Sequence, residues 1–129
     1  MRRPEQALHF QVARFLELAT KPPTLWSTFP SGGGGKTRGA LLKRMGLKAG
    51  MPDIVLFHPG PFPAAMFTRL IGIELKAGKG QQSQAQKAIA AAWEKAGGTY
   101  LICRSVEEVE ILLAASGIPL YARSIRRSQ

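Results

Sequence analysis

The fold of this chain is decided by two short stretches, PDIVLF at residues 52–57 and LIGIELK at residues 70–76. Both are rich in β-branched residues and bounded by Gly or Pro, a pattern that predicts two β-strands paired as a hairpin. Side chains alternate between the two faces of a strand, so Glu74 and Lys76 point to the same side. Asp53 is the only aspartate of the chain and opens the first strand. We therefore expect two carboxylates and one ammonium group to converge at the strand ends.

Asp53 and Glu74 offer carboxylate oxygen atoms, the ligands that hard divalent cations prefer. Mg²⁺ bound by one or two carboxylates, with water and substrate phosphates completing its shell, is the usual arrangement for phosphodiester chemistry. Lys76 would then orient the attacking water or stabilise developing charge. The structural alternative is that Asp53 caps a turn while Glu74 pairs with Lys76 on a solvated strand face.

Two polar residues on helices extend this candidate site. Glu5 lies in the first turn of a helix predicted over residues 4–19 and would supply a third carboxylate; the alternative is an interaction with the helix dipole alone. Gln86 follows Ser83 by three residues, the spacing of a capping box, so it either lines the site from this helix or only caps it. The two roles of Gln86 are compatible with each other.

The rest of the sequence predicts a single α/β domain over residues 1–129, with short basic termini. Helices are predicted at residues 4–19, 37–45, 84–96 and 106–116, and strands at residues 25–29, 53–57, 70–75 and 99–103. Ser105, with Glu108 three residues later, predicts a second capping box. The order α-β-(α)-β-β-α-β-α implies a mixed four-stranded sheet flanked by helices, with a right-handed parallel crossover between the last two strands.

The charge balance favours a polyanionic partner. The chain has 18 Lys and Arg residues against 8 Asp and Glu, a formal net charge of +10 and a pI near 10.5. These values indicate nucleic acid ahead of a membrane surface, with a basic surface kept for solubility as the alternative. Residues 36–48, here named the basic segment, contain no acid, and its cations are expected to bind DNA phosphates: Lys36, Arg38, Lys43, Arg44 and Lys48.

Other features narrow the class of protein. The chain lacks an apolar run of about 18 residues, as a membrane span requires, and its start lacks the apolar core of a signal peptide, so we expect an intracellular protein. The single Cys103 cannot form an intramolecular disulfide and is expected in the core. Residues 30–37 resemble a phosphate-binding loop, but Pro30 stands where that pattern needs Gly. We instead expect a mobile Gly-rich loop that carries Lys36 and Arg38 to DNA phosphates.

These residues, in this order, resemble the PD-(D/E)XK nucleases and, more specifically, the VRR-NUC family of virus-type replication-repair nuclease domains. The similarity spans about residues 4–114 and has four parts. Glu5 matches the acid of the family's first helix, and residues 46–53 match its Gly-rich approach to the aspartate. Residues 72–76 match its second motif, and residues 83–86 match its glutamine motif.

The resemblance implies a restriction-endonuclease-like fold and Mg²⁺- or Mn²⁺-dependent hydrolysis of DNA phosphodiester bonds. Under this interpretation the metal is bound by Asp53, Glu74, the backbone carbonyl of Leu75 and Glu5, the last directly or through water. Lys76 acts on the attacking water, and Gln86 positions the site. The main rival is a nucleic-acid-binding module without catalysis, against which the intact set of acids argues.

The resemblance also implies a phage or bacterial protein that dimerises, as junction-resolving nucleases do. A four-way junction needs two symmetric cuts, which a C2 homodimer would deliver. Phe62, Met66 and Phe67 lie in a Pro-rich loop, residues 59–67, that departs from the family pattern, and we expect them to supply part of the dimer interface. We therefore predict a homodimer that prefers branched DNA, such as a four-way junction, over linear duplex.

Overall fold

The computed structural model describes residues 3–30, 35–60 and 67–121 of the chain. Within these ranges four helices and four strands follow one another in the predicted order, α-β-α-β-β-α-β-α. The helices are α1 (Arg3–Ala19), α2 (Gly35–Arg44), α3 (Gln84–Lys95) and α4 (Val106–Ala115). The strands are β1 (Leu25–Thr28), β2 (Ile54–Pro59), β3 (Thr68–Leu75) and β4 (Thr99–Cys103).

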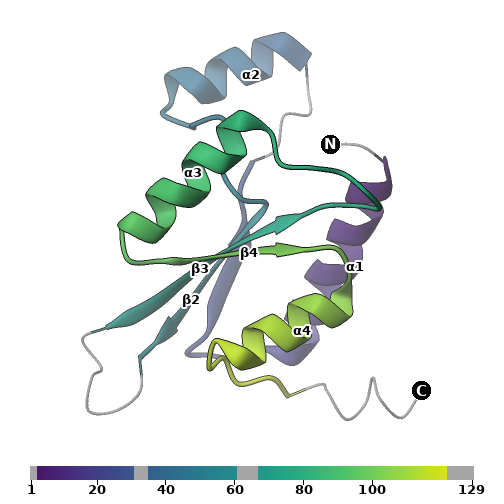
Figure 1. Cartoon of the computed structure of the whole chain (residues 1–129), viewed down its shortest axis with the longest axis vertical. Coiled ribbons are helices and arrows are strands. Elements are labelled where there is room, and N and C mark those ends of the chain that lie inside the picture. Colours follow the sequence, from purple (N-terminus) through teal and green to yellow (C-terminus); the bar gives the residue numbers. More distant parts are fainter. Residues whose placement is uncertain (1–2, 31–34, 61–66, 122–129) are drawn as a thin grey trace.

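The strands form one mixed sheet in the order β1-β2-β3-β4 (Figure 1). The pairs β1–β2 and β2–β3 are antiparallel, and the pair β3–β4 is parallel. The predicted hairpin and the parallel connection through α3 are thereby confirmed. Every strand lies beside its neighbour in the chain.

Helices cover both faces of the sheet. α1 and α4 lie on one face, and α3 lies on the other (Figure 1). The core fills the space between the sheet and α1 and α4, where alternate strand residues such as Ile54, Leu56 and Ile73 are fully buried. Cys103 belongs to this core, as predicted, and burial raises the pKa of its thiol to about 12.

α3 lies close to the sheet because β3 has a glycine beneath the helix. A Cβ atom at Gly72 would lie 3.0 Å from the indole ring of Trp93 and 2.9 Å from Cγ of Pro52, so a larger residue would push the helix away. Trp93 packs edge-on against Tyr100 of β4, with ring centroids 6.2 Å apart. This second face of the sheet, under α3, is the one that carries Glu74.

α2 is set apart from the rest of the molecule. It projects beyond α3 in Figure 1, and none of its residues is buried. It begins at Gly35, two residues earlier than predicted, and Gly46 follows it with a φ of +106°, as expected of a residue that ends a helix. Across residues 3–30, 35–60 and 67–121, no helix combines the length and the apolar character needed to cross a bilayer.

The structure corrects some local predictions. The hydroxyl of Ser105 accepts the Glu108 N–H at 3.1 Å, but the Glu108 carboxylate accepts the N–H of Arg104 rather than that of Ser105, so the second capping box is only half formed. β1 ends at Thr28, one residue short of the prediction, and β2 continues through Pro59. Of the residues predicted for a dimer interface, Phe67 is 65% exposed, whereas Phe62 and Met66 fall outside the described residues.

Candidate active site

Asp53 and Glu74 face each other across the β2–β3 hairpin. Ile54 pairs with Ile73 in this ladder, and continuing the antiparallel register by one residue places Asp53 opposite Glu74. The carbonyl of Asp53 accepts the Phe29 N–H at 3.0 Å, so β1 fixes the start of β2 as well. The convergence of the two acids that the sequence predicted therefore follows from the strand register.

The carboxylate of Asp53 is held by the backbone of β3. Its Oδ2 accepts the N–H of Leu75 at 2.7 Å, which places the Leu75 peptide beside the acid. Burial raises the pKa of Asp53 above its usual value, and the negative charges of Glu74 and Glu5 add to the rise. The Leu75 N–H and the nearby His9 lower the pKa of Asp53 but do not cancel the effect of burial. The site thus carries negative charge that its own hydrogen bonds do not fully stabilise.

The two oxygen atoms of Glu74 have different surroundings. Oε1 accepts the hydroxyl of Tyr100 at 2.6 Å and the amide of Gln82 at 3.0 Å. Oε2 is buried, lies 3.7 Å from Nζ of Lys76, and has no hydrogen-bond partner among the described residues. A buried carboxylate oxygen without a hydrogen-bond donor is unfavourable, and the Lys76 ammonium group lies within ion-pair range of Oε2.

The structural alternative correctly paired Glu74 with Lys76, but it wrongly placed the pair on a solvated strand face. A solvated ion pair would leave both side chains exposed, whereas Glu74 is 0% and Lys76 8% exposed. Nζ of Lys76 donates to Oε1 of Gln86 at 2.9 Å, closer than it lies to Glu74. The ammonium group is therefore fixed inside the site rather than on a solvated strand face.

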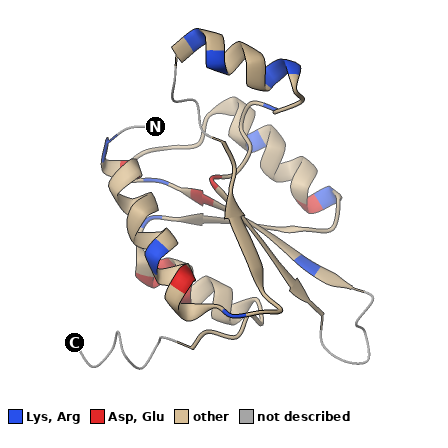
Figure 2. Ribbon diagram, turned by 180° about the vertical axis from the view of Figure 1, so that it is seen from behind, with Lys and Arg blue, Asp and Glu red and all other residues tan. Residues whose placement is uncertain are grey.

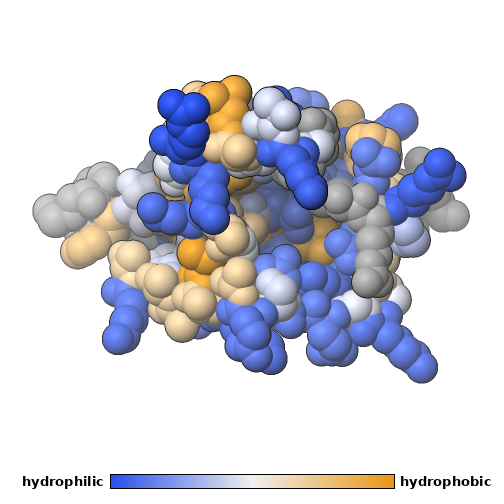
Figure 3. All heavy atoms as spheres, turned by 90° about the horizontal axis from the view of Figure 1, so that it is seen from above, coloured by the Kyte–Doolittle hydropathy of each residue, from blue (hydrophilic) through white to orange (hydrophobic). Residues whose placement is uncertain are grey.

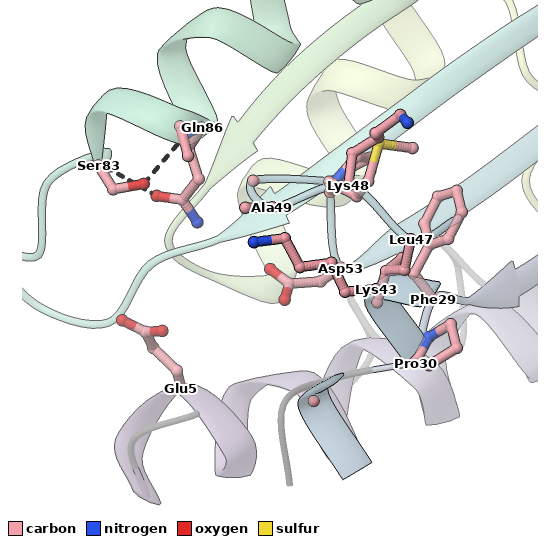
Figure 4. Close-up of a pocket in the computed structure, with 15 residues that line it drawn as sticks. Glu5, Phe29, Pro30, Lys43, Leu47, Lys48, Ala49, Asp53, Ser83 and Gln86 are labelled. Atoms are coloured by element: carbon pink, nitrogen blue, oxygen red, sulfur yellow. Dashed lines mark hydrogen bonds between the residues drawn. The ribbon is translucent and has the colours of Figure 1, made fainter. Parts of the chain in front are cut away.

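Gln86 caps its helix and contacts Lys76 at the same time. Its Oε1 accepts the N–H of Ser83 at 2.9 Å, and its own N–H donates to Oγ of Ser83 at 3.1 Å, which completes the predicted capping box (Figure 4). The same Oε1 accepts Lys76 Nζ, so both roles considered from the sequence are present. A residue that is locked by a cap is a rigid support for the ammonium group.

The loop before Asp53 lies directly on the first turn of α3. Gly50 has a φ of +88°, and a Cβ atom there would lie 2.4 Å from the backbone of Ala85. Only a glycine combines this conformation with this close approach. The contact brings Asp53 and Gln86, which are far apart in the sequence, to the wall of one cleft.

That cleft, of about 560 Å³, also receives Glu5 and two cations of the basic segment, Lys43 and Lys48 (Figure 4). Glu5 reaches in from α1, on the opposite side from Ser83 and Gln86. Nevertheless, no group of three or more His, Cys, Asp or Glu side chains among the described residues is placed to hold a metal ion together.

The basic segment lies mainly on α2, where Lys and Arg occur without an acid (Figure 2). Lys43 and Lys48 line the cleft, whereas Lys36, Arg38 and Arg44 do not line it and are exposed. Seen from the α2 end, the surface is hollowed, and both hydrophilic and apolar side chains border the hollow (Figure 3). The basic segment thus borders the cleft that Glu5 and Asp53 line.

Sequence reasoning missed three residues around the acids. Gln82 and Tyr100 contact Glu74, as described above. His9 lies one helical turn after Glu5; its Nε2 is 2.9 Å from the hydroxyl of Thr28, which donates to the carbonyl of Asp53 at 2.8 Å. The register pairs Tyr100 with Gly72, two residues from Glu74 on the same face. That register was the only signal for Tyr100, and a single sequence does not reveal it.

Comparisons with known proteins support this fold. Neither protein-family models nor curated protein sequences gave a match. Among solved structures, the chain is similar to a "VRR_NUC domain protein", with a TM-score of 0.66, 20% identity, and coverage of 89% of this chain and 88% of that chain. It is also similar to a "VRR_NUC domain" structure, with a TM-score of 0.53, 16% identity, and coverage of 88% and 97%. The chain therefore has the fold of VRR_NUC domain proteins, which confirms the resemblance and the fold class predicted from the sequence.

Proposed function

We propose that this protein is a metal-dependent nuclease that hydrolyses phosphodiester bonds in DNA. The observation that carries the proposal is the Glu74 carboxylate, which is buried opposite Asp53 with one oxygen lacking a hydrogen-bond donor among the described residues. Binding alone gives no reason to bury such an oxygen beside Asp53, which lines the basic cleft. The two similar solved structures are VRR_NUC domain proteins, and this likeness supports a nuclease-type activity.

The donor set fits Mg²⁺ or Mn²⁺. Oε2 of Glu74, the carboxylate of Asp53 and the backbone carbonyl of Leu75 are hard oxygen ligands, and Mg²⁺ is commonly bound by one or two carboxylates together with water and phosphate. The raised pKa of Asp53 and the unpartnered Oε2 both indicate negative charge that a cation would stabilise. When bound, the metal would lower the pKa of a water molecule and neutralise charge on the phosphate.

The chain's own residues would do the rest. Lys76, fixed by Gln86 at 2.9 Å, holds its ammonium group where it orients the attacking water or meets the developing negative charge. Lys43 and Lys48 border the cleft and bind the phosphates on either side of the scissile bond. Glu5 contributes its negative charge from α1 and holds water in the cleft.

The test is a cleavage assay with purified protein and linear duplex, flap and four-way junction DNA, with Mg²⁺, Mn²⁺ or EDTA. We expect cleavage only with a divalent cation, and its loss in Asp53→Asn and Glu74→Gln. Glu94→Gln, an exposed acid on α3, is the matched control and should cleave like the wild type.

Cleavage in EDTA, or full activity of Asp53→Asn and Glu74→Gln, would overturn the assignment. DNA binding without cleavage under every condition would favour the non-catalytic binding module instead. Retained DNA affinity in the two variants is expected, because both acids repel phosphate unless a cation lies between them.

A further inference from the structure

We propose that Tyr100 and Gln82 are positioning residues that clamp Oε1 of Glu74 and thereby reserve Oε2 for the cation. The proposal rests on the function proposed above and adds two residues to it. Under this proposal Glu74 binds the cation only through Oε2, and not through either oxygen atom interchangeably.

The hydrogen bonds at Oε1 saturate that atom. A carboxylate oxygen has about two lone-pair sites for donors. Both sites are used at Oε1, by the Tyr100 hydroxyl at 2.6 Å and by the Gln82 amide at 3.0 Å. Oε2 is equally buried but receives no donor from the described residues. The carboxylate is therefore divided into one occupied and one open oxygen.

The two donors come from different elements, which fixes the plane of the carboxylate. Tyr100 reaches Glu74 from β4, and its ring is held edge-on by Trp93 of α3. Gln82 reaches it from the connection between β3 and α3. The last torsion of a free Glu side chain is broad, so without this clamp the two oxygen atoms would exchange places. Partners of this kind, which orient a metal ligand, typically contribute 10- to 100-fold, roughly, to affinity or activity.

The same segment also keeps the ammonium group of Lys76 from occupying Oε2. Gln86, four residues after Gln82, accepts Lys76 Nζ at 2.9 Å, whereas Nζ remains 3.7 Å from Oε2. The distance is beyond a hydrogen bond. The segment of residues 82–86 thus holds Glu74 through Gln82 and Lys76 through Gln86, so the two side chains stay within ion-pair range without a hydrogen bond at Oε2.

The experiment measures Mn²⁺ binding to the full-length protein without DNA, by calorimetry or electron paramagnetic resonance. Tyr100→Phe removes only the hydroxyl and keeps the ring against Trp93, and Gln82→Leu removes the other donor. Tyr121→Phe, the other tyrosine, and Gln81→Leu, the exposed neighbour, are the matched controls. We expect Mn²⁺ affinity to fall about 10-fold or more in each clamp variant and to stay unchanged in the controls.

A second readout separates positioning from a merely structural role. Thermal unfolding in EDTA shows whether a clamp variant is folded, and DNA affinity in EDTA should equal that of the wild type. In cleavage assays the clamp variants should need more Mn²⁺, with an unchanged KM for DNA once the metal is saturating. If Tyr100→Phe does not fold, Gln82→Leu decides the outcome.

The possible failures are distinct. Wild-type Mn²⁺ affinity in both folded clamp variants would overturn the clamp and leave the nuclease proposal standing. A wild-type protein that binds no divalent cation would overturn the nuclease proposal, and the clamp with it.

Discussion

At the scale of single residues, the site places negative charge on Asp53 and Glu74 that the surrounding hydrogen bonds do not fully stabilise. Asp53 is half buried, its pKa is raised by burial, and Glu74 and Glu5 repel its charge. Glu74 keeps one oxygen without a donor among the described residues. If the proposed cation binds there, it would relieve the cost of burying this charge, so we infer that function and stability oppose each other at these acids.

Asp53→Asn should stabilise the metal-free protein. A carboxyl whose folded pKa lies above its unfolded value of 3.8 binds its proton more tightly when folded, so its contribution to stability is lost as pH rises through the folded pKa. At pH 7 the ionised Asp53 is a net destabilising group. We expect the variant to gain on the order of 1 kcal/mol in the free energy of unfolding in EDTA.

Thermal and urea unfolding in EDTA at pH 7 measure the gain, with Glu94→Gln as a control that should not change. The stability difference between Asp53→Asn and wild type should shrink as the pH is lowered towards 4. A lower melting temperature for Asp53→Asn at pH 7 would contradict this account of the site.

Lys76→Met should reduce turnover by a factor on the order of 10² or more, because the ammonium group meets charge that develops in the transition state. Methionine keeps the apolar stem of the buried side chain, and Mn²⁺ affinity should change little. Single-turnover cleavage at saturating Mn²⁺ measures the effect, with the exposed Lys79→Met as the control. Turnover at the wild-type rate would reduce Lys76 to a packing residue.

At the scale of elements, the sequence predicted the parts whose cause is local. The short runs rich in β-branched residues and bounded by Gly or Pro predicted β2 and β3, and the spacing of Ser83 and Gln86 predicted the cap of α3. The contacts of Tyr100 depend on the register between β3 and β4, which arises only when the chain is folded. Glu108 shows the same limit, since the capping-box spacing predicted that its carboxylate accepts the N–H of Ser105, whereas it accepts the N–H of Arg104.

Gly50→Ala should disturb the cleft through the contact between the 46–53 loop and α3. The added Cβ would lie 2.4 Å from backbone atoms of Ala85, so the loop that carries Asp53 must move. We expect a loss of roughly 1–3 kcal/mol in stability together with reduced cleavage. Gly46→Ala is the matched control, because its φ is also positive, at +106°, but its Cβ would meet nothing within 4 Å.

Unfolding curves and cleavage rates of the two glycine variants separate backbone strain, which both share, from the collision, which only Gly50→Ala has. Equal losses of stability and activity in both variants would mean that the contact with α3 does not position Asp53.

At the scale of the whole molecule, charge is distributed unevenly around the cleft. The basic segment approaches the acids from the α2 side, and α2 makes no contribution to the buried core (Figures 1 and 2). A helix that is not needed for packing and carries only basic charge is best explained by its partner. If that partner is the DNA proposed above, the net charge of +10 would make its phosphates the main source of binding energy.

Replacing Lys43 and Lys48 by Gln should flatten the dependence of log K on log salt. Each phosphate contact contributes about 0.9 to the slope, so the double variant should lose about 2 units. Lys87→Gln combined with Lys95→Gln, on the exposed surface of α3, removes the same charge and should alter the slope less. Binding titrations at several salt concentrations in EDTA measure the slope for each double variant. Equal slopes would mean that the DNA does not contact Lys43 and Lys48.

We also propose that the protein acts as a homodimer that prefers four-way junctions over linear duplex, because two symmetric cuts match C2 symmetry. The exposed Phe67 before β3 supports an apolar contact there. Light scattering at micromolar concentration should give twice the chain mass for the wild type. Phe67→Ser should lower the measured mass, whereas Ile111→Ser, at an exposed position on α4, is the control and should not. A monomeric mass for the wild type would contradict the dimer, and equal cleavage of junction and duplex would contradict the preference.

Each strand of the sheet lies beside its neighbour in the chain. This order affects how the protein folds. No strand has to be inserted between two that are already paired, so each step of assembly closes only the connection between consecutive strands, which keeps the entropic cost of ordering low. Closing the β2–β3 hairpin alone brings Asp53 and Glu74 together. Tyr100 arrives only when the helical crossover docks β4, so we expect the two acids to meet before the residue that orients one of them is in place.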